Sequence, residues 1–159
     1  MNSKVGIREG KPTDIDQVYE LIKELAVFEK AADEVAIGPE NLREDAFGKN
    51  AIAEIFVAEK DGDVVGAAII YEKYSTWKGR SMHLEDLIVK EEYRGMGIGK
   101  KFFEFLIKLA AERNYGRMEW QVLDWNEPAI EFYKKYESQF LEEWLDCRLD
   151  RKDLMRLSK

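Results

Sequence analysis

The chain has 159 residues, 45% hydrophobic and 36% charged, a balance that excludes a disordered protein and predicts a single domain over residues 1–159. Its net charge of −7 argues against binding nucleic acids or anionic membranes and favours a cationic small substrate. Cys147 is the single cysteine, so an intrachain disulfide is excluded, and no Cys/His cluster predicts a metal site. Residues 1–5 lack a signal-peptide pattern, and we expect a cytoplasmic protein.

Two helices are predicted after a short first strand at residues 5–8. Thr13 has the character of a helix N-cap, and an apolar stripe carries this first helix to about Glu29. Pro39 opens a second, shorter helix that ends near Gly48.

An antiparallel meander of three strands is predicted next, over residues 52–60, 64–74 and 80–89. The sequence Asp61-Gly62-Asp63 is typical of a tight hairpin turn between the first two strands. Trp77-Lys78-Gly79 marks the turn into the third.

The third strand runs into a glycine loop followed by an amphipathic helix. The first turn of a helix has unpaired N–H groups and the positive end of the dipole, so this succession suits a bound phosphate. Glycines also let the backbone take positive φ and approach an anion closely. The spacing matches neither the dinucleotide fingerprint nor the P-loop. It fits Arg-x-x-Gly-x-Gly instead, with Arg94, Gly97 and Gly99 in register and Gly95 between them.

The remaining elements follow that helix, which Gly116 is expected to end. Alternation predicts a strand over 117–123, and Asn126-Glu127-Pro128 begins another helix. Residues 144–150 alternate again, so we expect a last strand with Cys147 packed in the core beside two leucines.

The loop motif resembles that of the GNAT superfamily of N-acetyltransferases. Further segments resemble its diamine (spermidine/spermine) N-acetyltransferase branch, which includes relatives that prefer thialysine: Lys23–Ala26, Glu29, Leu84–Asp86, Tyr93–Gly99, Trp125–Pro128 and Phe132–Lys134. The resemblance covers nearly the whole chain. It implies an α/β fold with a central, mostly antiparallel sheet of splayed strands flanked by helices. It also implies transfer of the acetyl group of acetyl-CoA to a primary amine of a diamine, a polyamine or a lysine-like amino acid, without a metal, by a homodimer.

The resemblance assigns acetyl-CoA to three segments. The loop would hold the pyrophosphate, the splayed end of the third strand would bond the pantetheine arm, and the start of the helix at 126 would also meet the cofactor. The residues implied are Leu87, Ile88, Val89, Arg94, Gly95, Met96, Gly97, Ile98, Gly99, Lys100, Asn126, Glu127, Pro128 and Ala129.

Acetyl transfer requires a neutral amine, and a primary alkylamine has a pKa of about 10.4, so the amine must lose a proton on the enzyme. Strand 80–89 contains three candidate groups, His83, Glu85 and Asp86. Strict alternation puts His83 and Glu85 on one face and Asp86 on the other. The resemblance favours Glu85 as the carboxylate that binds the amine and takes its proton through water, with His83 as the second candidate.

The resemblance makes Tyr133 the general acid that protonates the departing thiolate, since tyrosine and thiol pKa values are close. Direct transfer in a ternary complex is expected, because Cys147 is assigned to the core. A cationic substrate would be held by acidic and aromatic side chains, implied to be Phe28, Glu29, Glu85 and Glu143.

Two positions depart from the branch. Ser75 stands where its polyamine enzymes have an acid, and Lys135-Tyr136-Glu137 lacks the usual glycine. The first departure favours a shorter amine or a lysine-like acid over long polyamines. The alternatives are acetylation of protein lysines or N-termini, and a noncatalytic acyl-CoA-binding regulatory module. The sequence alone leaves open the physiological amine, the identity of the base, the oligomeric state and the course of the last hairpin.

Overall fold

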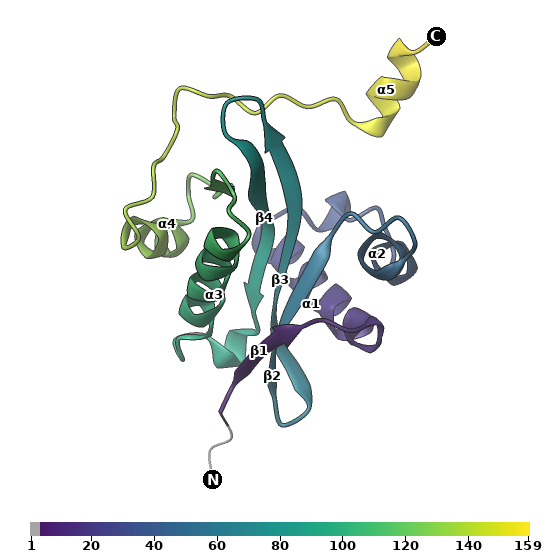
Figure 1. Ribbon diagram of the computed structural model, residues 1–159. Coiled ribbons are helices and arrows are strands. Elements are labelled where there is room, and N and C mark those ends of the chain that lie inside the picture. Colours follow the sequence, from purple (N-terminus) through teal and green to yellow (C-terminus); the bar gives the residue numbers. More distant parts are fainter. Residues whose placement is uncertain (1–3) are drawn as a thin grey trace. The chain divides into compact units, whose positions relative to one another are not determined.

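The computed structural model describes residues 4–159, which fall into two compact units divided between Gln121 and Val122. The first three residues, on which the expectation about a signal peptide partly rests, lie outside the described residues. The first unit is built on a five-stranded sheet of order β1-β2-β3-β4-β5 (Figure 1). Its strands are β1 (Gly6–Glu9), β2 (Glu54–Lys60), β3 (Asp63–Ser75), β4 (Gly79–Val89) and β5 (Met118–Glu119). The first four pair antiparallel, which confirms the predicted meander, and β5 pairs parallel to β4.

Helices precede and follow the β2–β3–β4 meander of the first unit. They are η1 (Pro12–Asp14), α1 (Ile15–Phe28), η2 (Ala32–Glu34), α2 (Pro39–Phe47), η3 (Glu91–Tyr93) and α3 (Ile98–Glu112). The second helix was predicted correctly, but the N-cap of the first was not. Thr13 lies inside η1, and Asp14 is the N-cap of α1. The reason is that the Asp14 carboxylate accepts the backbone N–H of Lys11 at 2.7 Å, which closes a 3₁₀ turn before the α-helix begins.

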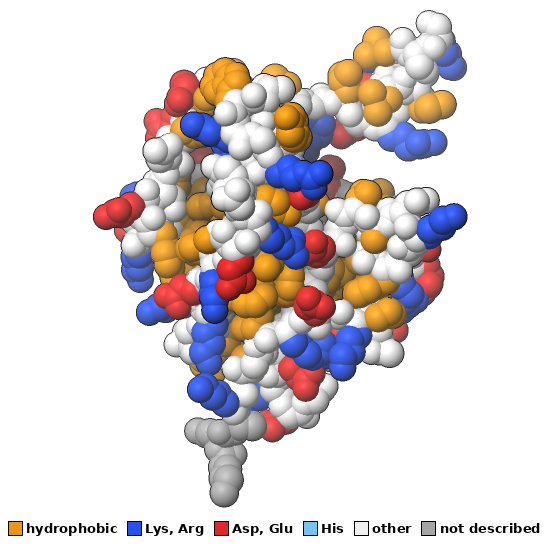
Figure 2. Space-filling view, in the orientation of Figure 1, with side chains coloured by type: hydrophobic (Ala, Val, Ile, Leu, Met, Phe, Trp, Pro, Cys, Tyr) orange, Lys and Arg blue, Asp and Glu red, His pale blue; other side chains and the backbone are white. Residues whose placement is uncertain are grey.

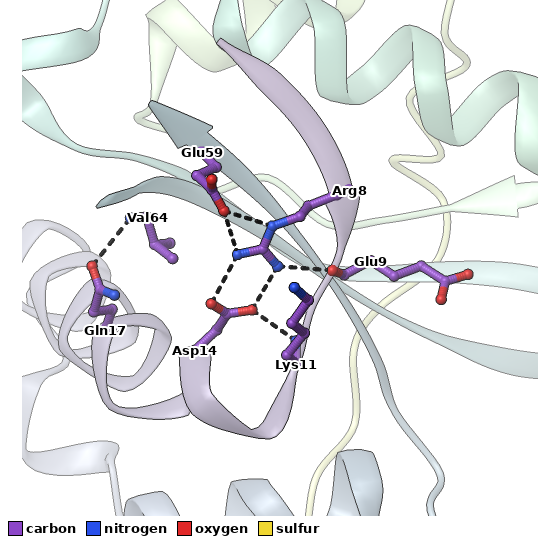
Figure 3. Close-up of polar contacts among 7 residues, drawn as sticks. All are labelled: Arg8, Glu9, Lys11, Asp14, Gln17, Glu59 and Val64. Carbon is purple, nitrogen blue, oxygen red and sulfur yellow. Dashed lines mark hydrogen bonds and ion pairs between the residues drawn. The ribbon is translucent and has the colours of Figure 1, made fainter. Parts of the chain in front are cut away.

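Asp14 also anchors the start of α1 to the sheet through Arg8 of β1 (Figure 3). The Arg8 guanidinium donates to both Asp14 oxygens, at 2.7 and 3.0 Å, and its Nε donates to Glu59 of β2 at 2.7 Å. Asp14 is 6% exposed, and the hydrogen bonds from Arg8 hold the pKa of its carboxyl below the ordinary value. This partly buried network of ion pairs connects β1, η1 and β2.

Apolar side chains cover both faces of the sheet, because successive residues of a strand point to opposite sides. On one face α1 and α2 pack against β2, β3 and β4 (Figure 1), and the buried residues of this cluster are Ile15, Val18, Leu21, Leu42, Ile55, Val57, Val64, Ala67, Ile69 and Ile88. On the other face lies α3, whose Phe105 ring meets Phe56 edge-on at 5.0 Å. Gly66 allows this close packing, since a Cβ there would lie 3.1 Å from the Phe102 ring.

The hairpin turn between β2 and β3 has the predicted chemistry. Asp61 and Gly62 both have positive φ, 54° and 90°, as a two-residue turn of this kind requires. Helices α1 and α3 end in the same way, with Lys30 (φ 58°) and Asn114 (φ 54°) in the left-handed conformation. At both ends the next N–H bonds back to a helix carbonyl, as in a Schellman motif.

Gly116 therefore does not end α3 as predicted, because Asn114 takes the left-handed position two residues earlier. Asparagine tolerates this conformation better than other non-glycine residues. Gly116 is needed for a different reason: a Cβ there would lie 2.0 Å from the Lys78 carbonyl oxygen. Its N–H donates to the Arg80 carbonyl at 2.9 Å, which brings the chain alongside β4.

The predicted strand at 117–123 is much shorter in the structure. Only Met118 and Glu119 form β5, opposite Met82 and His83 of β4. Directly after them the Trp120 ring packs edge-on against Phe103 of α3, 5.1 Å away, so the chain follows the helix and leaves the ladder.

The second unit contains α4 (Glu127–Lys134) and α5 (Arg151–Leu157). The start of α4 was predicted correctly, whereas α5 was not predicted. The last predicted strand, at 144–150, is wrong, and Cys147 is exposed, so the prediction that it packs in the core is wrong too. A strand needs a partner, and the described residues 122–159 contain none. Apolar side chains are exposed along this segment and on α5 (Figure 2), among them Leu145 at 86% and Leu154 at 54%.

Candidate functional site

The glycine loop joins the end of β4 to α3 through η3. Gly95 and Gly97 have φ of 77° and 78°, a conformation that side-chain-bearing residues rarely adopt, and Gly97 is the N-cap of α3. Gly99 was predicted to lie in the loop, but α3 begins at Ile98, so Gly99 belongs to its first turn. The reason is that Ile98 is 2% exposed and anchors the helix start in the core.

The first turn of α3 is open to a ligand. No side chain of the described residues caps it, and a Cβ at Gly95, Gly97 or Gly99 would meet nothing within 4 Å. Backbone N–H groups at such a helix start attract anions. Ile98 can contribute only its backbone, while Met96 is 60% exposed and Lys100 lies 3.8 Å from Glu104.

Arg94 fixes the loop to two neighbours. Its Nε donates to the Val89 carbonyl at 3.1 Å, and its guanidinium lies over the Phe28 ring, 5.7 Å from the centroid. Arg94 thereby connects the end of β4 to the end of α1. It also brings together Phe28 and the glycine loop, which were assigned separately to substrate and cofactor.

Beyond His83, no strand of residues 4–159 pairs with the outer edge of β4, so this edge is open as the resemblance implied. The Lys90 N–H donates to Val65 of β3 at 3.0 Å. Because bonding directions alternate in an antiparallel ladder, Ile88 also faces β3, while Leu87 and Val89 face outward. The contact from Arg94 to the Val89 carbonyl agrees with this assignment. Of the three predicted backbone donors, Leu87 and Val89 are therefore directed to the open edge.

A β-bulge at Glu85 changes the faces of β4. Ile69 pairs with Asp86 and Ile70 with Leu84, so Glu85 is the extra residue of the bulge in β4. Tyr71 pairs with His83, and residues 69 and 71 of β3 share a face. Asp86 and His83 therefore lie on the same face, and the prediction that they lie on opposite faces is wrong.

Three carboxyl groups interact at this face. Burial raises the pKa of Asp86 to about 6, and the charges of Glu85 and Glu29 add to the effect. Burial also raises the pKa of Glu29, which is the C-cap residue of α1 and stands just before the Schellman motif. The three carboxyl groups together can bind an ammonium ion, and a carboxyl that titrates near neutral pH can also accept a proton.

His83 lies next to this group. Its side chain is 12% exposed, and its Nε2 is 3.4 Å from the Glu85 Oε2. The ring packs on Tyr71, with centroids 4.7 Å apart. Its Nδ1 is buried and has no hydrogen-bonding partner among residues 4–159.

Asp86 was named among the candidate acids and bases of strand 80–89, but it was given no role in the predicted site. The signal was present, since Glu85-Asp86 interrupts a strand that is otherwise apolar from Leu84 to Val89. Ser75, where the branch has an acid, accepts the N–H groups of Trp77 and Lys78 at 3.2 and 3.1 Å and so stabilises the β3–β4 turn.

The remaining predicted site residues lie in the second unit. The Asn126 Oδ1 accepts the Ala129 N–H at 3.4 Å and caps α4, whose first turn contains Glu127 and Pro128. Tyr133 is 9% exposed, and its carbonyl accepts the Ser138 hydroxyl at 2.9 Å. Glu143 is exposed outside any helix or strand.

Within residues 4–159, no group of three or more His, Cys, Asp or Glu side chains is placed to hold a metal ion. No helix in that range combines the length and the apolar character that crossing a bilayer requires.

Comparison with known proteins agrees with the fold. The model of the Acetyltransferase (GNAT) family matches residues 15–137. The chain is 44% identical over 147 residues to a thialysine N-epsilon-acetyltransferase of Bos taurus, covering 87% of this chain and 86% of that protein. It is 39% identical over 163 residues to one of Mus musculus, covering 96% of each. An integron cassette protein from the mobile metagenome of V. cholerae has the same fold, with a TM-score of 0.80 at 22% identity over 98% of both chains. The predicted fold class and the prediction of an enzyme are confirmed: this chain belongs to the GNAT family and is an acetyltransferase.

Proposed function

We propose that this acetyltransferase moves the acetyl group of acetyl-CoA to a primary amine of a small cationic substrate, such as thialysine, lysine or a diamine. The observation that carries the proposal is the group of Glu29, Glu85 and Asp86 on one side of β4, adjoining the contact between Phe28 and Arg94. Carboxylates attract an ammonium group, and an aromatic side chain can add a cation–π contact. The names of the similar bovine and murine proteins, which refer to thialysine, support the same class of substrate.

Acetyl-CoA is proposed to bind with its pyrophosphate on the backbone of residues 94–100, where the helix start is uncapped. The outward N–H groups of Leu87 and Val89 would bond the pantetheine arm and polarise the thioester carbonyl. In the second unit, residues 126–129 are proposed to meet the cofactor as well. The cap of α4 uses the Asn126 Oδ1, so the amide NH₂ group of that side chain is the part proposed for this contact.

The chemistry proposed is a direct attack of the neutral amine on the thioester. The ammonium binds to Glu29, Glu85 and Asp86, with Glu143 as a further proposed contact, and loses its proton to Glu85 through water. A C–N bond then forms, the C–S bond breaks, and Tyr133 gives its proton to the departing thiolate. The Tyr133 phenolate then takes the surplus proton from the acetylated nitrogen, which leaves the neutral amide and restores the phenol. Since Cys147 is exposed, burial no longer argues against an acetyl-cysteine intermediate. A Cys147→Ser enzyme that keeps its kcat would support direct transfer, whereas loss of activity in a folded variant would favour a covalent route.

We also propose that residues 1–159 act as one domain, since the family model spans 15–137 and so includes residues of both units. A homodimer and a cytoplasmic location complete the proposal. Sedimentation velocity of the purified protein and fractionation of cells test these two points.

The decisive experiment is a coenzyme A release assay across thialysine, lysine, ornithine, diamines, polyamines and a neutral alkylamine of matched length. We expect the cationic substrates to exceed the neutral amine in kcat/KM by at least about tenfold, or about 1.4 kcal/mol. Equal turnover of the neutral amine would contradict charge recognition. Activity confined to lysine-containing peptides or protein N-termini would contradict the small-substrate proposal.

A further inference from the structure

We propose that a cluster of one acidic and two basic side chains binds the α-amino-acid head of the substrate, and that it selects a lysine-like amino acid over a diamine. This Lys73 cluster consists of Lys73, Glu119 and Arg117. The inference rests on the proposed function, since the reacting amine must bind at the acidic group of Glu29, Glu85 and Asp86. It is carried by the face on which the Lys73 cluster lies, by its charges and by its spacing from the acidic group.

The Lys73 cluster lies on the face of the sheet that carries the acidic group. The bulge puts Asp86 and His83 on one face of β4, and Tyr71 is the partner of His83 on β3. Lys73 follows Tyr71 by two residues and therefore shares its face. Glu119 of β5 is also in register with His83, so its side chain points to the same side.

The Lys73 cluster has more positive than negative charge. Each oxygen of Glu119 meets one cation, the Lys73 Nζ at 2.8 Å and the Arg117 guanidinium at 2.9 Å. Burial raises the pKa of Glu119, but the hydrogen bonds from Lys73 and Arg117 outweigh it and hold that pKa below its ordinary value. Two cations thus share one carboxylate, and their side chains are 46% and 32% exposed. A substrate carboxylate would balance the second cation, and its α-ammonium group would bind Glu119.

Tyr71 lies between the Lys73 cluster and the acidic group. Burial raises the pKa of the Tyr71 phenol, the charge of Glu85 raises it further, Lys73 lowers it and Glu119 raises it. The phenol is therefore within electrostatic reach of both sets of charges. Its ring packs on His83, with centroids 4.7 Å apart, and Tyr71 is 37% exposed. Such a ring offers an apolar surface to the methylene chain of a substrate.

The spacing suits a substrate of the length of lysine. Asp86 and His83 pair with residues 69 and 71 of β3, two positions or about 7 Å apart along the strand. An extended lysine side chain spans about 6 Å from its terminal nitrogen to Cα. With the reacting amine at the acidic group, beside the strand end proposed for the thioester, Cα reaches the level of Glu119. A diamine of equal length would bring a second ammonium group to a place where cations outnumber anions.

The test compares L-lysine with cadaverine, which differs from it only by the missing carboxylate. In the coenzyme A release assay we expect the wild type to prefer lysine in kcat/KM by at least about tenfold. Lys73→Met keeps the stem and removes the charge, so kcat/KM for lysine should fall at least about fivefold, mainly through KM, with cadaverine changed less than about twofold. Lys73→Arg should keep the preference. Mass spectrometry of the product should place the acetyl group on the side-chain nitrogen.

Arg80→Met is the matched control, because it removes a cation from the same β3–β4 hairpin on the opposite face. Arg80 pairs with Tyr74 in the ladder and its guanidinium binds Glu72 at 3.0 Å. We expect this variant to leave kcat/KM for both amines unchanged.

Each other outcome contradicts a particular step. Equal turnover of lysine and cadaverine by the wild type would refute the head-group subsite and leave the proposed function standing. Loss of both activities alike in Lys73→Met would make Lys73 a structural residue, and loss of neither would remove it from the site. Acetylation of the α-nitrogen would reverse the direction of binding and refute the placement. A wild type that turns over no small cationic amine would contradict the proposed function itself, and the inference with it.

Discussion

The carboxyl groups of Glu29, Glu85 and Asp86 lie close together, and their mutual repulsion should destabilise the fold. Removing the Asp86 carboxyl tests this cost most directly. Its ordinary pKa of 3.8 is raised to about 6, first by burial and then by the charges of Glu85 and Glu29. The folded protein therefore binds this proton more tightly than the unfolded chain does. Stability is gained as pH falls through about 6 and is lowest at alkaline pH, the reverse of the usual case for an aspartate.

The size of the effect follows from the two pKa values. Their difference corresponds to about 3 kcal/mol of destabilisation once Asp86 is ionised in both states, as at pH 8. At pH 5, where the folded protein holds most of the proton, about half of that remains. Asp86→Asn removes the charge, so we expect it to stabilise the protein roughly 3–6 °C more at pH 8 than at pH 5. Any cost of burying the new amide is the same at both pH values and cancels.

Thermal unfolding of the wild type and Asp86→Asn at the two pH values measures this difference. Asp63→Asn is the matched control, because Asp63 is exposed at the start of β3 and should show no such dependence. In the coenzyme A release assay, Asp86→Asn should lower kcat/KM for the cationic amine. It should also remove an acid limb near pH 6, below which Asp86 is protonated. Equal shifts of the unfolding midpoint at both pH values would refute the reasoning, since ionisation of Asp86 would then not destabilise the folded protein.

Four further substitutions test the site and the second unit. Gly97→Asp should raise the acetyl-CoA Kd at least about tenfold, or about 1.4 kcal/mol, because it strains a residue at φ 78° and adds a repelling charge. If calorimetry shows an unchanged acetyl-CoA affinity in the folded variant, the loop does not bind the pyrophosphate and serves only as a turn. Glu85→Gln should lower kcat/KM for the cationic amine and move the pH–rate profile toward higher pH; an unmoved profile would exclude Glu85 as the base. Tyr133→Phe should reduce kcat at least about a hundredfold with acetyl-CoA affinity little altered, and a variant keeping more than about half its kcat would assign Tyr133 to packing. Glu137→Gly should stabilise the protein by about 1 kcal/mol, or roughly 2–4 °C in the unfolding midpoint, because Glu137 has a φ of 55°. Glu137→Ala should bring no comparable gain, and an equal gain from both variants would exclude backbone strain as the cause.

The features predicted correctly from the sequence are those set by local chemistry. The Asp61-Gly62 turn requires positive φ at both residues, and this alone fixes the β2–β3 hairpin. The proline in the first turn of α4, after Asn126, likewise defines a helix start without help from the rest of the chain.

The errors concern choices that depend on distant residues. Asn114 and Gly116 could each have ended α3, and Asn114 takes the left-handed position. Gly116 is required because a Cβ would clash with the Lys78 carbonyl oxygen, a contact that the local sequence does not reveal. The bulge at Glu85 arises from the register with β3, which alternation along β4 cannot reveal, so Asp86 was placed on the face opposite His83. Residues 144–150 have the alternation of a strand, but alternation supplies no partner. The departure noted at residues 135–137 does have a physical counterpart, since Glu137 adopts the conformation in which glycine is usual.

The approach of Gly116 to Lys78 has a consequence for how such chains diverge. A side chain at 116 would place its Cβ 2.0 Å from a backbone oxygen, and a carbonyl group cannot swing aside as the end of a flexible side chain can. Position 116 is restricted to glycine by lack of space and not by backbone conformation, so a residue that merely tolerates positive φ cannot replace it. Two segments more than thirty residues apart, the β3–β4 turn and the stretch before β5, must therefore change together. In a descendant that lost Gly116, the turn at Lys78 would have been rebuilt, by a shift or a change in length, in the same lineage.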